Sequence, residues 1–145
     1  MIITDFYIKN LRWLYIVFIL TFCSAFGQTF FISLYSGEIR AAFDLTHGQW
    51  GLIYSCATLS SAILILFLGG YADSISAKSL STLVILGLIV FVFLMANNTS
   101  TFGLVLIILG LRFFGQGMLI HISMFFFVKL FFKNKGNAVA VANSV

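Results

Sequence analysis

The chain has 145 residues, of which 61% are hydrophobic and only 8% are charged. Its mean hydropathy is +1.12. Soluble domains carry about 25% charged residues, so water could not solvate a folded surface this poor in charge. The composition therefore excludes a soluble domain and a disordered chain, and the presence of only two cysteines excludes a disulfide scaffold. A net charge of +4 does not indicate a nucleic-acid partner here, because the basic residues are not clustered on a soluble face. The sequence predicts an integral membrane protein.

Four apolar runs are long enough to cross a bilayer, whose hydrocarbon core of about 30 Å needs about 20 helical residues. They cover residues 13–35, 50–69, 80–96 and 102–128. The last run alone contains a charge, Arg112. The predicted fold is all-α, a polytopic membrane helix bundle, with a cytoplasmic N-terminus over residues 1–12 and a transmembrane helical domain over residues 13–145.

A fifth apolar helix is predicted to begin near residue 137 and to be cut off at residue 145. Half a span would leave backbone N–H and C=O groups without partners in lipid, at several kcal/mol per group. We therefore expect the chain to be a fragment or a truncated form of a longer membrane protein.

Basic residues are distributed unequally between the two sides of the predicted bundle. Six lie on the side of the N-terminus, namely Lys9, Arg12, Lys78, Lys129, Lys133 and Lys135. Only Arg40 lies on the other side. The positive-inside rule then predicts a multi-pass protein of the inner (plasma) membrane with a cytoplasmic N-terminus.

The connection between the first two spans, residues 36–49, is the only one with room for polar structure. Its end has the pattern of a helix start. Thr46 and Gln49 have the spacing of a capping box, and Leu45 and Trp50 are placed as a hydrophobic staple. The second helix is predicted to begin sharply at this point.

Arg112 is the charged residue inside a predicted span. It lies ten residues beyond Phe102, which by helical rise is about 15 Å from the outer surface, at the midplane. A charge there costs at least about 2.5 kcal/mol and is rarely retained without a use. At about 100° per residue, Gln116 and Ser123 fall within about 40° of Arg112. The three residues are predicted to form one polar stripe that faces protein or water.

Three glycines, Gly103, Gly110 and Gly117, recur every seven residues on nearly the opposite face of the same helix. Glycines at this spacing favour the close approach of a neighbouring helix. His121 joins that face. For His121 we favour a packed or hydrogen-bonded side chain over a role in proton relay.

Polar side chains also share a face on each of the first two helices. They are Thr21, Ser24, Gln28 and Tyr35 on the first helix, and Tyr54, Thr58 and Ser61 on the second. For the hydroxyls we favour ordinary hydrogen bonding between helices. For Gln28 a structural and a ligand-binding interpretation stay equally open, because a buried amide has four bonding sites.

The tripeptide Phe-Gly-Gln occurs twice, at residues 26–28 and 114–116. The two copies lie at nearly mirrored depths in helices that run in opposite directions. This symmetry is expected of an inverted three-plus-three-helix repeat, and transporters are built from such repeats. If the first and fourth helices pair in this way, Gln28 approaches Arg112 and Gln116.

Enzymatic chemistry has no basis in the sequence. It contains no Cys or His cluster with metal-ligand spacing, no phosphate-binding glycine loop and no paired acids within a span. We therefore predict that the protein is not an enzyme and needs no cofactor, apart from a coupling ion, proton or counter-solute.

The loop after the second span, residues 69–78, reads Gly-Gly-Tyr-Ala-Asp-Ser-Ile-Ser-Ala-Lys. It resembles the signature of the major facilitator superfamily, in which Gly-x-x-x-Asp precedes a basic residue, x, Gly and further basic residues. Gly69, Asp73 and Lys78 match this signature. Serines replace the usual basic residue at position 74 and the usual glycine at position 76.

Other segments extend the resemblance over nearly the whole chain. Residues 112–117 look like the fourth-helix motif of the superfamily, and residues 133–136 resemble the basic-Gly step that opens its fifth helix. Residues 26–28, together with the loop that follows, look most like bacterial members near the monocarboxylate and oxalate/formate group. The resemblance implies the N-terminal portion of a twelve-helix fold whose two halves rock about a central site.

The predicted function is that of a secondary active transporter, or of its N-terminal fragment, which moves a small organic solute by alternating access, with a carboxylate anion favoured. The predicted substrate-binding residues are Arg112, Gln116 and Gln28. The resemblance implies gating residues at Gly69, Asp73 and Lys78. In the family, the carboxylate at the position of Asp73 ties neighbouring helices together in the outward-open state.

The expected partners are the lipid bilayer, the solute, and the missing C-terminal half or another chain, with no nucleic acid. An alternative function is a small four-helix membrane protein that acts by assembly with partners and transports nothing.

The topology can be tested by cysteine labelling at Asn98, in the short polar turn between the third and fourth spans. We expect Asn98→Cys, in a chain whose Cys23 and Cys56 are replaced by serine, to react with a membrane-impermeant maleimide added from outside the cell. Reaction only from the cytoplasmic side would contradict the predicted orientation.

Overall fold

A computed structural model describes residues 2–72 and 75–133 of the chain. The described residues form no strand, and their helical elements follow one another as α1 (Ile2–Ser24), η1 (Ala25–Gly27), α2 (Thr29–Leu34), α3 (Ser36–Ala42), α4 (His47–Ala72), α5 (Ala77–Asn97), α6 (Thr101–Leu111), η2 (Arg112–Leu119) and α7 (Ile120–Lys133). The all-α prediction is confirmed.

Four helical stretches are long and apolar enough to cross a membrane. They are Ile8–Leu34, His47–Gly70, Lys78–Asn97 and Thr101–Val128. These stretches agree with the four predicted spans to within a few residues at each end. The fifth helix predicted from residue 137 lies outside the described residues, as do Lys135 and Gly136.

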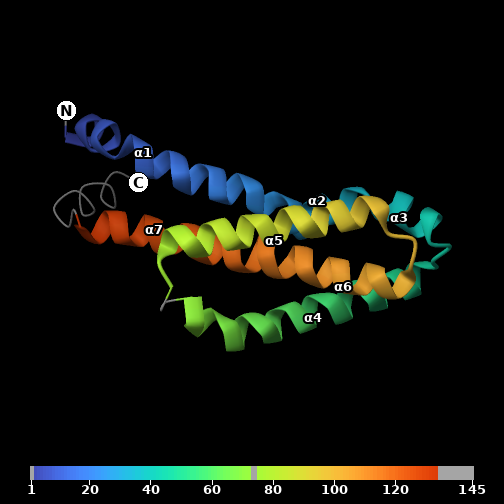
Figure 1. Cartoon of the computed structure of the whole chain (residues 1–145). Coiled ribbons are helices and arrows are strands. Elements are labelled where there is room, and N and C mark those ends of the chain that lie inside the picture. Colours follow the sequence, from blue (N-terminus) through green and yellow to red (C-terminus); the bar gives the residue numbers. More distant parts are fainter. Residues whose placement is uncertain (1, 73–74, 134–145) are drawn as a thin grey trace.

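The fourth span, made of α6, η2 and α7, is the centre of the bundle. Half of its most apolar window is buried, against about a fifth for each of the other spans. Helix α1 packs on α7 and η2, while α4 and α5 both pack on α6 and η2. Figure 1 shows α1 and α4 on opposite sides of the fourth span. The fourth span therefore positions all the other helices.

The closest approach of two backbones joins the two Phe-Gly-Gln copies. A Cβ atom added to Gly115 would lie 2.7 Å from the Cα atom of Gly27, and one added to Gly27 would lie 2.8 Å from the Cα atom of Gly115. No real Cβ atom tolerates such contacts, so both positions require glycine. The first and fourth helices thus pair through the repeated motif.

Gly103, Gly110 and Gly117 do not all face one neighbouring helix, so the single face predicted for the three glycines is only partly present. The space beside Gly103 is filled by the Asn98 side chain, that beside Gly110 by the Phe91 ring, and that beside Gly117 by Ile65. These side chains come from the turn before α6, from α5 and from α4. Gly103 and Gly110 lie in α6 and face α5 or its end, whereas Gly117 lies in η2 and faces α4. The change of winding at η2 thus separates Gly117 from the other two glycines.

Two helices are irregular at the level of the glycine contact. The first span is interrupted at Gln28, whose backbone is extended (φ −83°, ψ 151°). The fourth span widens into π-helix over Arg112–Leu119, in which hydrogen bonds run from residue i to i+5. Helix faces predicted from a constant rotation of about 100° per residue therefore do not continue through either segment.

The connection between the first two spans is more ordered than a loop, because it contains α3. Backbone geometry ends this helix: Asp44 has φ 50°, and the N–H of Leu45 donates to the carbonyl oxygen of Arg40 at 2.9 Å, as in a Schellman motif. The predicted capping box is confirmed. The N–H of Gln49 donates to Thr46 Oγ1 at 3.2 Å, and the N–H of Thr46 donates to Gln49 Oε1 at 2.9 Å.

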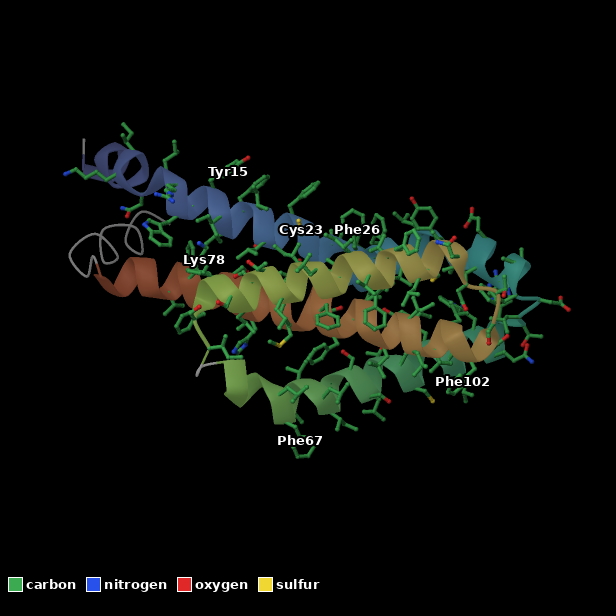
Figure 2. All side chains as sticks on the ribbon, viewed as in Figure 1. Tyr15, Cys23, Phe26, Phe67, Lys78 and Phe102 are labelled. Atoms are coloured by element: carbon green, nitrogen blue, oxygen red, sulfur yellow. The ribbon has the colours of Figure 1, made fainter. Side chains whose placement is uncertain are left out.

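The segments predicted to be cytoplasmic share one end of the bundle. Figure 1 shows the start of α1, the end of α4, the start of α5 and the end of α7 at that end. Figure 2 places Lys78 there and Phe102 at the opposite end. The arrangement agrees with the grouping of basic residues on which the predicted orientation rests.

Substitution of Gly115 tests the backbone contact. We expect Gly115→Ala to lower the free energy of unfolding by at least about 1–3 kcal/mol, the cost of overpacking a tight interior, because backbone atoms cannot give way. The measurement is unfolding in mixed micelles, followed by circular dichroism. Gly51→Ala on α4 is the matched control, since a Cβ atom there meets nothing within 4 Å, and it should leave stability unchanged or slightly raised. Equal effects of the two substitutions would contradict the contact.

Candidate functional site

A buried arginine lies at the centre of the polar side chains inside the bundle. Arg112 is 8% exposed. Its Nη1 donates to Thr29 Oγ1 at 2.7 Å and to the Tyr54 hydroxyl at 3.0 Å. The Tyr54 hydroxyl in turn donates to Thr29 Oγ1 at 3.0 Å, which closes a triangle. The Tyr54 ring adds a cation–π contact, with its centroid 5.4 Å from the Arg112 Cζ atom. We call these three residues the arginine cluster.

The arginine cluster solvates a positive charge without neutralising it. Both hydrogen-bond partners are neutral hydroxyls, and within residues 2–72 and 75–133 no carboxylate forms an ion pair with Arg112. The alternative to solute binding is a structural role in which Arg112 bonds to helix carbonyls or to an acid, but the observed partners are neither. The hydrogen bonds to described residues all leave from Nη1, so Nη2 and Nε are further donors along the outer edges of the guanidinium.

The break at Gln28 explains why Thr29 belongs to the cluster. Thr29 is the first residue of α2, immediately after the extended residue. The change of direction turns its hydroxyl toward Arg112, 83 residues further along the chain. Sequence analysis missed Thr29 because it assumed a continuous first helix. The only signal was its place directly after a Gly-Gln step.

Gln28 makes its hydrogen bond within its own segment. Its Nε2 donates to Ser24 Oγ at 3.1 Å, and Ser24 Oγ donates to the carbonyl oxygen of Thr21 at 2.6 Å. The structure does not join Gln28 to Arg112 by a hydrogen bond. The predicted stripe on the first helix is also incomplete, because the side chains of Thr21 and Tyr35 are exposed while Ser24 is buried.

Two buried polar atoms near the cluster lack a partner. Gln116 Oε1 and Thr58 Oγ1 are inaccessible to solvent and accept no hydrogen bond from the described residues. Gln116 lies about one turn beyond Arg112, and Thr58 lies one turn beyond Tyr54 on α4. An unpaired buried polar atom costs about 1–3 kcal/mol, so each such atom calls for an explanation.

The other polar residues of the fourth span take no part in the cluster. Ser123 is buried and donates to the carbonyl oxygen of Ile120 at 2.9 Å, within its own helix. The His121 side chain is exposed and forms no hydrogen bond with the described residues, so the packed or hydrogen-bonded side chain that we expected is not found among them. Because the helix winding changes at η2, residues after η2 lie on other faces of the fourth span than a regular helix would predict.

Two of the three residues with a predicted gating role, Gly69 and Lys78, lie away from the arginine cluster, at the end of the bundle near the N-terminus. Gly69 lies in the last turn of α4 with open space beside it. Lys78 is exposed in the first turn of α5. Asp73 lies outside the described residues, so its role stays a prediction.

Comparisons with known proteins add no relative. No family model matches the chain, and neither a curated protein nor a solved structure matches it. Among the described residues, no three His, Cys, Asp or Glu side chains are grouped so that they could hold a metal ion. The functional argument therefore rests on the arginine cluster.

Removal of one hydroxyl tests how the charge is held. Tyr54→Phe keeps the ring under Arg112 but removes an acceptor, and we expect it to lower the free energy of unfolding by about 1.5–3 kcal/mol, the range for a hydrogen bond to a charged group. Tyr15→Phe is the control, because Tyr15 is exposed, and it should change stability by less than about 0.5 kcal/mol. A Tyr54→Phe protein as stable as the control would show that the hydroxyl does not hold Arg112.

Proposed function

We propose that the chain forms part of a secondary active transporter of the major facilitator type, which moves a small organic carboxylate across the membrane by alternating access. The observation that carries this proposal is a buried mid-span arginine whose hydrogen-bond partners are neutral. A positive charge at that depth is costly, and charged residues inside membrane spans mark the path of a solute or ion.

The chemistry of the cluster suits a carboxylate. A guanidinium presents a planar fork that matches the two carboxylate oxygens, and such a pair is stronger where little water competes. With Nη1 held by Thr29 and Tyr54, the remaining edge through Nη2 is oriented in advance. Thr29 is exposed, so the cluster reaches the surface of these helices on that side.

The irregular backbone at the same depth supports the proposal independently. Transporters place substrate sites near the midplane, where discontinuous helices of two repeats meet. Here the extended residue Gln28 and the π-helical segment Arg112–Leu119 lie next to the contact of Gly27 with Gly115. Irregular backbone is tolerated at membrane depth where protein covers it or where it lines a cavity.

The remaining predicted residues have secondary roles in this proposal. Gln116 Oε1 would accept a hydrogen bond from a substrate hydroxyl or N–H group once the helices shift, because nothing in the described bundle occupies it. Gln28 would have to leave Ser24 to take part. Gly69, Asp73 and Lys78 keep the gating role implied by the resemblance. Further helices, from a C-terminal half or from another chain, would supply the opposite wall.

The alternative function, assembly without transport, makes a different use of the same charge. Arg112 would then pair with an acid on a partner helix rather than with a solute. In that case the purified chain would bind no free carboxylate, and loss of the guanidinium would weaken co-purification of the partner.

Replacement of Arg112 by lysine tests the proposal, because lysine keeps the charge and loses the fork. In the complete protein, we expect Arg112→Lys to weaken carboxylate binding by about 1.5–3 kcal/mol, the value of a charge-assisted hydrogen bond. The measurement is binding of a panel of radiolabelled mono- and dicarboxylates to the protein in liposomes. Arg12→Lys is the control, since Arg12 is exposed near the N-terminus. Near-wild-type affinity in Arg112→Lys, with normal expression, would show that Arg112 does not bind the solute.

A further inference from the structure

A second concave site lies apart from the arginine cluster. It is a cleft of about 470 Å³ between α2 and α3 on one side and the end of α5 on the other, with α6 as its floor. Figure 1 shows these four helices together at the end of the bundle away from the N-terminus. The volume lies within the range of small-molecule sites, about 300–1,000 Å³. Arg112 does not line this cleft.

One wall of the cleft is aromatic. The Phe26 and Phe31 rings meet edge to face with centroids 5.1 Å apart, and the Phe31 and Tyr35 rings are 5.4 Å apart. Val92 and Met95 line the opposite wall. Figure 2 shows Phe26 at the level where the first span passes α5. The interior thus offers hydrophobic contact and aromatic faces.

The lining residues of the cleft extend from the end of the bundle to the middle of the fourth span. Asn98 lines it at the end of the bundle, and Leu111 lines it at the inner end. Leu111 lies ten residues after Thr101, the first residue of α6, which corresponds to a depth of about 15 Å. A long apolar chain, rather than a compact polar molecule, fits this shape.

The mouth carries one negative charge. Among the described residues, Glu38, in the first turn of α3, is the only charged one that lines the cleft. It is exposed and makes no ion pair with any described residue. The other polar side chains that line the cleft are neutral. They are the Tyr35 hydroxyl and the Asn98 amide, which donates to the Ser100 carbonyl oxygen at 2.9 Å and accepts from the Ser100 N–H at 3.1 Å. The Glu38 carboxylate is therefore the group that selects a ligand.

From this combination we propose that the cleft binds an amphiphile with a single cationic head, an alkyl- or arylalkylammonium. The tail lies between the aromatic wall and Met95, and the ammonium lies at Glu38 beside the Tyr35 ring, where a cation–π contact adds to the charge attraction. An anionic amphiphile of the same length is repelled by Glu38, and a neutral one gains nothing from it. This site does not depend on the proposed transport function.

Methionine methyl groups report occupancy of the cleft directly. The chain contains four methionines. Met95 lines the cleft, Met118 is buried in the core and Met124 is exposed on α7. With ¹³C-methyl-methionine protein in zwitterionic nanodiscs, dodecyltrimethylammonium should shift the Met95 resonance saturably and leave Met118 and Met124 in place. An absent Met95 shift, or equal shifts at Met124, would overturn the proposal.

Two variants of the protein and two further detergents distinguish the contribution of the Glu38 charge to binding from that of the shape of the cleft. Glu38→Gln should weaken dodecyltrimethylammonium binding about three- to fivefold, as expected for loss of an exposed ion pair. Ala42→Phe, which fills the cleft, should abolish the Met95 shift, whereas Ala62→Phe on the exposed face of α4 should not alter it. Dodecyl maltoside, which gains nothing from Glu38, should bind about as weakly as dodecyltrimethylammonium binds to Glu38→Gln, and dodecyl sulfate should bind more weakly still. Unchanged binding in Glu38→Gln, or an equal effect of dodecyl sulfate, would refute the selection of a cationic head.

Discussion

The contact between the backbones of Gly27 and Gly115 is the constraint on which the rest of the structure depends. A methyl group at either position would collide with the partner's main chain, so only glycine permits the first and fourth helices to cross this closely. The crossing occurs where the first helix is extended at Gln28 and where the fourth helix becomes π-helical. Backbone irregularity at membrane depth is costly unless neighbouring protein covers it. Each helix therefore covers the irregular segment of the other.

The arginine cluster follows from that crossing. Once the first helix restarts at Thr29, its hydroxyl comes within 2.7 Å of Arg112, and Tyr54 completes the triangle from α4. Three segments far apart in the sequence thus share the cost of burying one guanidinium. Hydroxyls stabilise the cation by their dipoles but leave its net charge in place, whereas a carboxylate would cancel it. Retention of that net charge makes the cluster suitable for attracting an anion.

The same interruption of the first helix lies beside the aromatic cleft. Phe26 before the extended residue Gln28 and Phe31 after it both line the cleft, together with residues of α3 and α5. The two sites have opposite charge. The arginine cluster presents a buried positive charge at mid-span, and the cleft presents the exposed negative charge of Glu38 beside an apolar interior. Residues on either side of one helix break thus contribute to two chemically distinct sites.

Much of the architecture was determined by the sequence itself. Hydrophobic run length predicts the four spans because the bilayer thickness sets helix length, and the capping box at Thr46 and Gln49 is local enough to be recognised by spacing. The repeated Phe-Gly-Gln motif indicated that the first and fourth helices pair. Tertiary structure alone decided which side chains surround Arg112. The face on which a residue lies can be predicted from its position only while the helix stays regular. The breaks at Gln28 and η2 are stabilised by contacts between segments that are distant in the sequence. Thr29 rather than Gln28 therefore reaches the arginine, and His121 lies exposed, because each break rotates every residue that follows it.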